Sequence, residues 1–176
     1  MPLNICAPHP RACPHPLNPR VAAWAGVGAI VCAVLVVQLL TGLIASGQIR
    51  TWYATLMKPA WSPAEWVFGP VWTALYVAMA VAAGFVWFAR DREDVCGALG
   101  LFGVLLAANL AWNIFFFGLR SPLLGLLDMT VLWTAVALTA VEFFRVSKPA
   151  GLLLVPYWLW VSYAAVLNAD ILLMNR

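Results

Sequence analysis

The sequence is poor in charged side chains. Only 10% of its 176 residues are Asp, Glu, Lys or Arg, whereas hydrophobic residues make up 64%. Soluble domains carry about 25% charged residues, so this composition disfavours water as the main solvent of the chain. We therefore expect an integral, multi-pass membrane protein whose main partner is the lipid bilayer.

Basic clusters are missing as well. The net charge is only +3, and the 10 Lys and Arg residues are dispersed along the chain. Nucleic-acid recognition needs a concentrated basic face, so no nucleic-acid partner is expected. A Gly-rich phosphate-binding loop is also lacking.

Histidine is absent from every apolar segment, because His9 and His15 both lie within the first twenty residues. The usual axial haem ligand is therefore missing. A Ser/His/Asp or Cys/His nucleophile pair and a His/carboxylate metal cluster are missing for the same reason. A hydrolase or metalloenzyme is not supported, and we expect no metal site, no catalytic residues of these kinds and no required cofactor. The cysteines give no disulfide framework; they are Cys6, Cys13, Cys32 and Cys96.

Five charge-poor runs dominate the rest of the chain, at about 21–49, 67–89, 95–119, 122–144 and 149–174. A helix needs ~20 apolar residues to cross ~30 Å of hydrocarbon, and backbone groups in lipid must bond internally. The alternating pattern of a membrane barrel is lacking. The sequence thus predicts an all-α fold, a five-transmembrane-helix bundle over 21–176. Short connections make neighbouring helices antiparallel, and only the loop between helices one and two, Gln48–Trp66, is long.

The first twenty residues, MPLNICAPHPRACPHPLNPR, predict a proline-rich, disordered tail. Cys6, His9, Cys13 and His15 are metal-ligating residue types. The prolines leave little room to close a four-ligand site, so disorder is favoured over metal binding.

Basic residues differ slightly between the two ends of the predicted bundle. The tail and the turns after helices two and four carry six Lys and Arg residues, and the opposite end carries four. Basic residues favour the cytoplasmic side, so the pattern predicts a cytoplasmic N-terminus.

A few polar residues lie inside the apolar runs. Asn109 and Asn113 are four residues apart, on one face of a helix. Such amides either form interhelical hydrogen bonds or contact a ligand, and the two roles remain open. Asp128 is costly to bury in a membrane, so either a functional role or a polar partner is expected.

The fifth run carries Trp160, Ala164, Leu167 and Asn168 at i, i+4, i+7, i+8 spacing, which places them on one helix stripe. A small residue beside a tryptophan leaves room for a flat molecule. Small residues also allow close helix packing, and on spacing alone packing is favoured.

Three stretches together carry a family resemblance. They read WYATLMKPAWSPAEWVFGPVWTALYVAM (Trp52–Met79), NLAWNIFFFG (Asn109–Gly118) and PYWLWVSYAAVLN (Pro156–Asn168). The pattern KPxWxPxxWxFxPVWxxLY with the later PYxxWxxxAxxLN resembles the TspO/MBR family. That family comprises the tryptophan-rich sensory proteins and the translocator proteins, also called peripheral benzodiazepine receptors. The likeness covers all five predicted helices and leaves out only the tail.

The resemblance implies a five-helix bundle with a ligand pocket beneath the loop between helices one and two. The implied ligands are porphyrins (protoporphyrin IX or haem), sterols, and isoquinoline or benzodiazepine compounds. By motif position the pocket includes Phe68, Trp72, Asn109, Trp112, Trp160, Ala164 and Leu167. Gly42, Ala45, Leu127 and Val131 complete the implied wall. Trp72 and Trp160 match two tryptophans implicated in light-dependent porphyrin degradation by bacterial relatives.

Two positions depart from the family pattern. Ala64 stands where the loop often has a second proline, which loosens the loop slightly. Ala169 stands where the sterol-recognition pattern has a tyrosine, so we expect sterol binding to be weak.

Three functions fit these features. The first is a membrane receptor or sensor that binds tetrapyrroles, since a flat, apolar, aromatic-lined cavity suits a planar macrocycle; Arg50 or Lys58 would meet its propionates. The alternatives are an enzyme that degrades protoporphyrin IX in light, with Trp72 and Trp160 as redox partners, and a porphyrin or lipid transporter. The lack of an internal repeat disfavours the transporter.

Helix three carries a line of small residues, Gly103, Ala107 and Ala111, which Gly97 and Gly100 extend. Such a line permits close contact between helices. It predicts a homodimer through helix three; packing within one bundle is the alternative.

The segment KPAWSPAEWVFGPVW (Lys58–Trp72) holds three tryptophans and three prolines. Pro59 and Pro63 stiffen the chain, and Pro70 is expected in the first turn of helix two, where proline costs least. Trp61 and Trp66 suit the membrane interface. With the family resemblance, the segment is interpreted as a semi-rigid lid with Trp72 facing a ligand beneath it.

Overall fold

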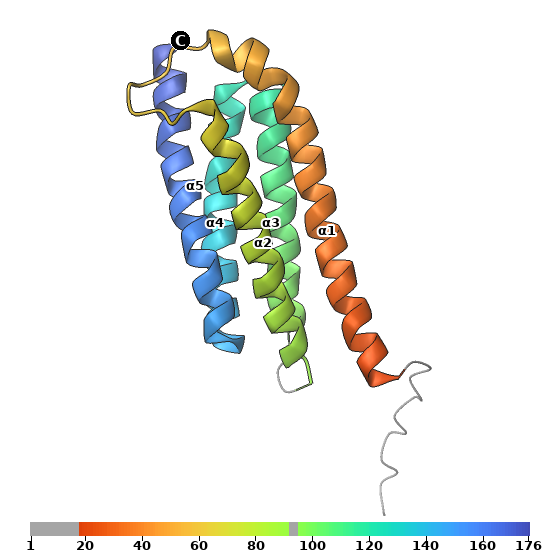
Figure 1. The fold of residues 1–176 in the computed structure, drawn as a ribbon. Coiled ribbons are helices and arrows are strands. Elements are labelled where there is room, and N and C mark those ends of the chain that lie inside the picture. The colour runs from red at the N-terminus through yellow and green to blue at the C-terminus, as the bar shows by residue number, and fades with distance from the viewer. Residues whose placement is uncertain (1–17, 92–94) are drawn as a thin grey trace, which may run out of the picture.

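The computed structural model describes residues 18–91 and 95–176, and in these ranges the chain is an all-α bundle (Figure 1). The elements are α1 (Pro19–Gln48), η1 (Ile49–Tyr53), α2 (Glu65–Ala89), α3 (Cys96–Asn113), η2 (Ile114–Gly118), α4 (Pro122–Val146) and α5 (Lys148–Met174). Five helical segments in these ranges are long and apolar enough to cross a membrane. The predicted five-helix architecture is confirmed. The four Cys and His residues of the tail lie outside the described residues.

The first helix is longer than the predicted 21–49. A π-helical turn, η1, carries it on to Tyr53, so that the first span covers Arg20–Tyr53, 34 residues. The extension is held by packing, because the Trp52 ring lies 5.4 Å from that of Phe116 and Tyr53 contacts the same ring at 6.2 Å. The Thr51 hydroxyl also donates a hydrogen bond to the Gly47 carbonyl at 2.8 Å.

The second helix starts earlier than predicted, at Glu65 rather than Val67. Pro70 consequently lies inside α2, in its second turn, and not in the first turn. A proline there leaves a carbonyl of the preceding turn without its intrahelical donor. The loop that joins the first two helices is therefore shorter than expected and spans residues 56–64, here called the α1–α2 loop.

Local sequence explains the start of α4. Ser121 accepts a hydrogen bond from the Leu124 N–H at 3.3 Å, and Pro122 occupies the first turn of α4, where its missing N–H costs little. Arg120 has a φ of 53°, in the left-handed region. This residue reverses the chain between η2 and α4.

The core lies mainly among α2, α3, α4 and α5, and α1 is peripheral. The most apolar window of α1 is only 11% buried, whereas those of the other four spans are 33–44% buried. Large apolar side chains face outward along α1, among them Leu35, Leu39 and Leu43. Such a surface suits lipid, and the chain is an integral, multi-pass membrane protein.

Helices α4 and α5 are joined by an unusually close contact. The Asn168 side-chain amide lies between the Pro122 carbonyl (3.1 Å) and the Leu126 N–H (2.9 Å) when its nitrogen donates to the first and its oxygen accepts from the second. Gly125 makes the approach possible, because a Cβ there would lie 3.2 Å from the nearer polar atom of the Asn168 side-chain amide. The start of α4 is thus fixed against α5.

Candidate functional site

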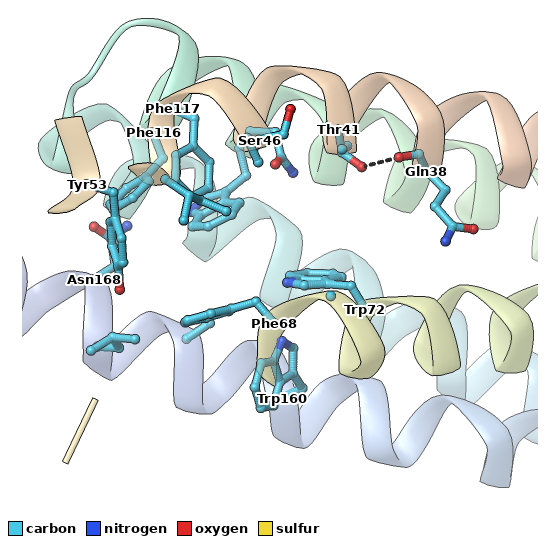
Figure 2. Close-up of a pocket in the computed structure, with 18 of the residues that line it drawn as sticks. Gln38, Thr41, Ser46, Tyr53, Phe68, Trp72, Phe116, Phe117, Trp160 and Asn168 are labelled. Carbon is cyan, nitrogen blue, oxygen red and sulfur yellow. Dashed lines mark hydrogen bonds between the residues drawn. The ribbon is translucent and has the colours of Figure 1, made fainter. Parts of the chain in front are cut away.

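A cavity of about 310 Å³ lies between α1, α2, α5 and the end of α3 (Figure 2). Its wall is mostly aromatic and aliphatic. The α1 and η1 side supplies Gln38, Thr41, Gly42, Ala45, Ser46, Ile49 and Tyr53, and α2 supplies Phe68, Gly69, Trp72, Thr73 and Tyr76. The α3 and η2 side supplies Trp112, Asn113, Phe116 and Phe117, and α5 supplies Trp160, Ala164, Leu167, Asn168 and Ile171. Ligand sites are commonly concave and apolar in this way.

Tyr53 closes the end of the cavity that lies beneath the α1–α2 loop (Figure 2). Its side chain is 4% exposed, and its ring packs against Phe68 (6.4 Å), Phe116 (6.2 Å) and Phe117 (6.0 Å). Lys58 covers the outer face, with its Nζ 4.3 Å from the ring centre and 2.7 Å from the Tyr53 carbonyl that it donates to. This end is therefore a packed aromatic roof.

The α1–α2 loop is fastened to α5 at two points. The Asn175 amide accepts from the Met57 N–H at 2.9 Å and donates to the Met57 carbonyl at 2.9 Å. Tyr163 donates to the Trp61 carbonyl at 3.2 Å, and the two rings lie 5.4 Å apart, edge to face. These contacts hold the loop down on the bundle.

The opposite end of the cavity is bounded by a series of buried side-chain hydrogen bonds, here called the polar floor. The Thr41 and Tyr76 hydroxyls lie 3.2 Å apart, and the Tyr76 hydroxyl donates to the side-chain oxygen Oδ1 of Asn109. The Asn109 nitrogen donates to the Tyr157 hydroxyl at 2.9 Å. These four residues link α1, α2, α3 and α5, so the floor is polar but internally hydrogen-bonded.

Two tryptophans of the wall keep unpaired indole donors. The Nε1 atoms of Trp112 and Trp160 are buried, and neither has a hydrogen-bond partner among the described residues. A buried N–H without a partner costs roughly 1–3 kcal/mol. The wall is thus apolar, and the Tyr53 hydroxyl is a third buried polar group of a lining residue without a hydrogen-bond partner among the described residues.

Comparison with known proteins identifies the family of this chain. The family model described as the TspO/MBR family matches residues 29–174. The chain belongs to the TspO/MBR family. The described part of the match includes all five membrane-spanning helices, as the sequence motifs had indicated.

Named TspO/MBR relatives come from distant organisms. The tryptophan-rich protein TspO of Chlorobaculum tepidum is 47% identical over 125 residues, which cover 70% of this chain and 79% of the relative. A protein of the same name from Archaeoglobus fulgidus is 38% identical over 150 residues, 84% of this chain and 95% of the relative. The human translocator protein is 40% identical over 124 residues, 69% and 73% of the two chains.

Most of the residues implied by the TspO/MBR motifs line the cavity. They are Gly42, Ala45, Phe68, Trp72, Trp112, Trp160, Ala164 and Leu167. Phe68 and Trp160 lie 6.1 Å apart, edge to face, and Trp72 contacts Tyr76 at 6.0 Å and Tyr157 at 6.1 Å. The motif therefore gathers its aromatic residues around one space.

Three expected residues lie elsewhere. Asn109 is fully buried behind the wall, where its side-chain amide is hydrogen-bonded to the hydroxyls of Tyr76 and Tyr157. The interhelical role that the sequence left open is thus the one observed. Leu127 and Val131 are 58% and 53% exposed on the outer face of α4 and do not line the cavity, because Gly125, Met129 and Leu132 take the inward face.

Asp128 is also not among the cavity residues. It is half-buried on α4, and its Oδ2 atom is buried without a hydrogen-bond partner among the described residues. The polar partner that the sequence suggested is therefore not found for this oxygen.

The sequence reasoning missed four aromatic residues of the wall: Tyr53, Tyr76, Phe116 and Phe117. Each lies inside a quoted motif, in WYATLM, PVWTALY or NIFFFG. The signal was present, but one apolar helix gives no indication of which aromatic ring faces inward. Both π-helical turns, η1 and η2, contribute to this set, and such turns are frequent at functional sites.

Proposed function

We propose that this TspO/MBR protein is a membrane receptor that binds a tetrapyrrole, protoporphyrin IX or haem, in the cavity beneath the α1–α2 loop. The observation that carries the proposal is the aromatic wall of the cavity, to which Phe68, Trp72, Trp112 and Trp160 contribute. A planar, apolar macrocycle stacks on aromatic rings, and such rings make up much of this wall. The described helices contain no histidine, which favours metal-free porphyrin or labile haem.

The size of the cavity sets how a macrocycle would lie. Its volume of about 310 Å³ is at the lower end of the ~300–1,000 Å³ range of ligand pockets. A tetrapyrrole therefore fills the cavity and extends an edge beyond it. Arg50 is exposed at the end of the first helix and is the better partner for a propionate, since Lys58 already donates to the Tyr53 carbonyl.

Binding is tested by titrating protoporphyrin IX, haem and cholesterol against intrinsic tryptophan fluorescence in detergent. We expect saturable quenching by the porphyrins and weak quenching by cholesterol. Ala164→Thr places extra atoms in the cavity wall, and an overpacking cost of about 1–3 kcal/mol weakens porphyrin affinity about tenfold or more. Val166→Thr, on the exposed face of α5, is the matched control. Absence of quenching by either porphyrin would refute the proposal.

A second function, light-dependent degradation of protoporphyrin IX, is favoured by one observation. Both tryptophans assigned to it, Trp72 and Trp160, line the same cavity and lie close to tyrosine rings. Loss of the porphyrin absorption band in light, with purified wild type but not Trp72→Phe, would identify an enzyme. Equal loss in both proteins indicates simple bleaching of a bound ligand.

We also propose a homodimer through α3. Gly97, Gly100, Gly103 and Ala107 are all exposed, and a Cβ on any of the three glycines would meet no atom within 4 Å. Ala111, the last residue of the predicted line, is half-buried, so the exposed stretch of this face runs from Gly97 to Ala107. This exposed stretch supports contact between protomers over packing within one bundle. The cytoplasmic N-terminus likewise stays a proposal, based on the basic residues near that end of the bundle.

A further inference from the structure

Exposure along the cavity wall is confined to one seam between two helices. Four lining residues are exposed, Gly42 and Ser46 of α1 and Gly69 and Thr73 of α2. Every lining residue from α3, η2 and α5 is buried or half-buried. The wall is therefore closed everywhere except between α1 and α2.

The open stretch of this seam has a defined lower edge. Gln38 donates from its side-chain amide to the Thr73 hydroxyl at 3.4 Å and ties the two helices together. Gly42 and Ser46 follow Gln38 by one and two helical turns, on the side of the α1–α2 loop. A Cβ on Gly42 or Gly69 would meet no atom within 4 Å, so side chains leave this stretch unfilled.

The end of the cavity toward the loop offers no comparable opening. Tyr53 fills it and is 4% exposed. The loop above is tied to α5 through the Met57–Asn175 and Trp61–Tyr163 hydrogen bonds. A molecule leaving by this route would have to break both ties and displace the Tyr53 ring.

The seam lies within the membrane-spanning segments Arg20–Tyr53 and Glu65–Ala89. Exposed apolar side chains flank it, with Leu39 and Leu43 on α1 at 62% and 64% exposure and Val77 on α2 at 57%. These surfaces suit hydrocarbon and not water. A molecule that passes through the seam therefore enters the bilayer directly.

We propose that the cavity exchanges its ligand with the interior of the bilayer through the α1–α2 seam, and that the Gln38–Thr73 hydrogen bond is the gate at its lower edge. The proposal rests on the proposed function in taking the cavity as the binding site. It adds that the ligand is delivered from the membrane and not from water, and so belongs to flat, apolar molecules that partition into lipid.

The route can be tested without any porphyrin. A single cysteine, Ala164→Cys, is placed on the cavity wall of a variant whose native cysteines are replaced by alanine, in proteoliposomes. Pyrene maleimide partitions into lipid, and a charged trimethylammonium methanethiosulfonate stays in water. We expect fast labelling by the first reagent and little by the second.

Two substitutions that fill the seam from opposite sides, Ser46→Trp and Thr73→Trp, should each slow pyrene maleimide labelling about tenfold. Leu43→Trp, an equally bulky change on the adjacent lipid-facing surface, should leave the labelling rate unchanged. Gln38→Ala removes the gate bond and should raise the rate about threefold or more. Because the filling and opening variants act in opposite directions, a general loss of folding cannot produce the pattern.

The proposal is overturned if the charged reagent labels Ala164→Cys faster than pyrene maleimide. It is also overturned if Asn175→Ala, which frees the loop, accelerates labelling while the seam variants behave like Leu43→Trp. Protoporphyrin IX, loaded from vesicles, gives the separate test of the proposed function. Seam-dependent labelling without porphyrin quenching would refute tetrapyrrole binding and retain the membrane route.

Discussion

Gly125 lies where α4 approaches η2 and α5 too closely for a side chain. A Cβ at this position would be 3.0 Å from Phe116 Cδ2, 3.1 Å from Phe116 Cβ and 3.2 Å from the nearer polar atom of the Asn168 side-chain amide. Neither neighbour moves freely, because Phe116 stacks on Trp112 at 5.1 Å and the Asn168 amide bridges two backbone groups of α4. Gly125→Ala therefore forces a shift of packed atoms.

The expected magnitude follows from two opposing effects. Overpacking of a filled site costs about 1–3 kcal/mol, and replacing glycine by alanine inside a helix returns about 0.5–1 kcal/mol. The net result is a loss of about 0–2.5 kcal/mol in the free energy of unfolding, and a loss of about 1–3 kcal/mol relative to a glycine-to-alanine change that meets no neighbour. At 1.4 kcal/mol for each factor of ten, the unfolding equilibrium constant rises by up to about 60-fold.

The assay is reversible unfolding by sodium dodecyl sulfate in dodecyl maltoside micelles, followed by circular dichroism. Gly28→Ala is the control, because its new Cβ would meet no atom within 4 Å and only the gain in helix propensity remains. Phe116→Val, which removes the closest contact atom, should reduce the cost of Gly125→Ala when the two are combined. A Gly125→Ala protein as stable as Gly28→Ala would refute the packing argument.

Three further outcomes are expected. Asn109→Leu leaves two tyrosine hydroxyls without their amide partner and should lower the free energy of unfolding by about 0.6–2 kcal/mol in the same titration; an unchanged midpoint would contradict the role of the polar floor. Asn175→Ala releases the α1–α2 loop and should speed amide hydrogen exchange at residues 57–61 about tenfold or more without changing exchange in α3, whereas equal exchange would show that the hydrogen bonds to Asn175 do not hold the loop. Gly103→Cys should form a disulfide-linked dimer in native membranes and Leu138→Cys, on the exposed face of α4, should not; equal yields from both would indicate random collision.

The five helices could be predicted from composition because lipid admits few other structures, but their ends could not. Hydropathy does not show that Trp52 and Tyr53 pack against the distant Phe116, and that contact carries the first helix past Ile49. The early start of α2 at Glu65 is similarly invisible, since Ala64 provides no capping side chain. The end of the first helix is thus decided by a tertiary contact and not by local propensity.

The candidate site was predictable where motif residues are aromatic and face inward, as for Trp72 and Trp160. It was not predictable on α4, because an apolar membrane helix has no polar face to mark its outer side. Leu127 and Val131 therefore look the same in sequence as Met129, which is buried. The prediction that Asn109 lines the cavity was wrong for another reason. The two tyrosines that hydrogen-bond to its side-chain amide are 33 and 48 positions away in the chain, so the sequence does not show that they are neighbours.

The length of the first span gives the bilayer itself a way to act on the site. Its 34 residues extend roughly 50 Å at 1.5 Å per residue, well beyond the ~30 Å of an average hydrocarbon core. Such a helix tilts to match the surrounding membrane, and α1 is the least buried wall of the cavity. Thicker, sterol-rich membranes reduce that tilt and thinner ones increase it. The separation between α1 and α2 is thus expected to depend on the thickness of the membrane.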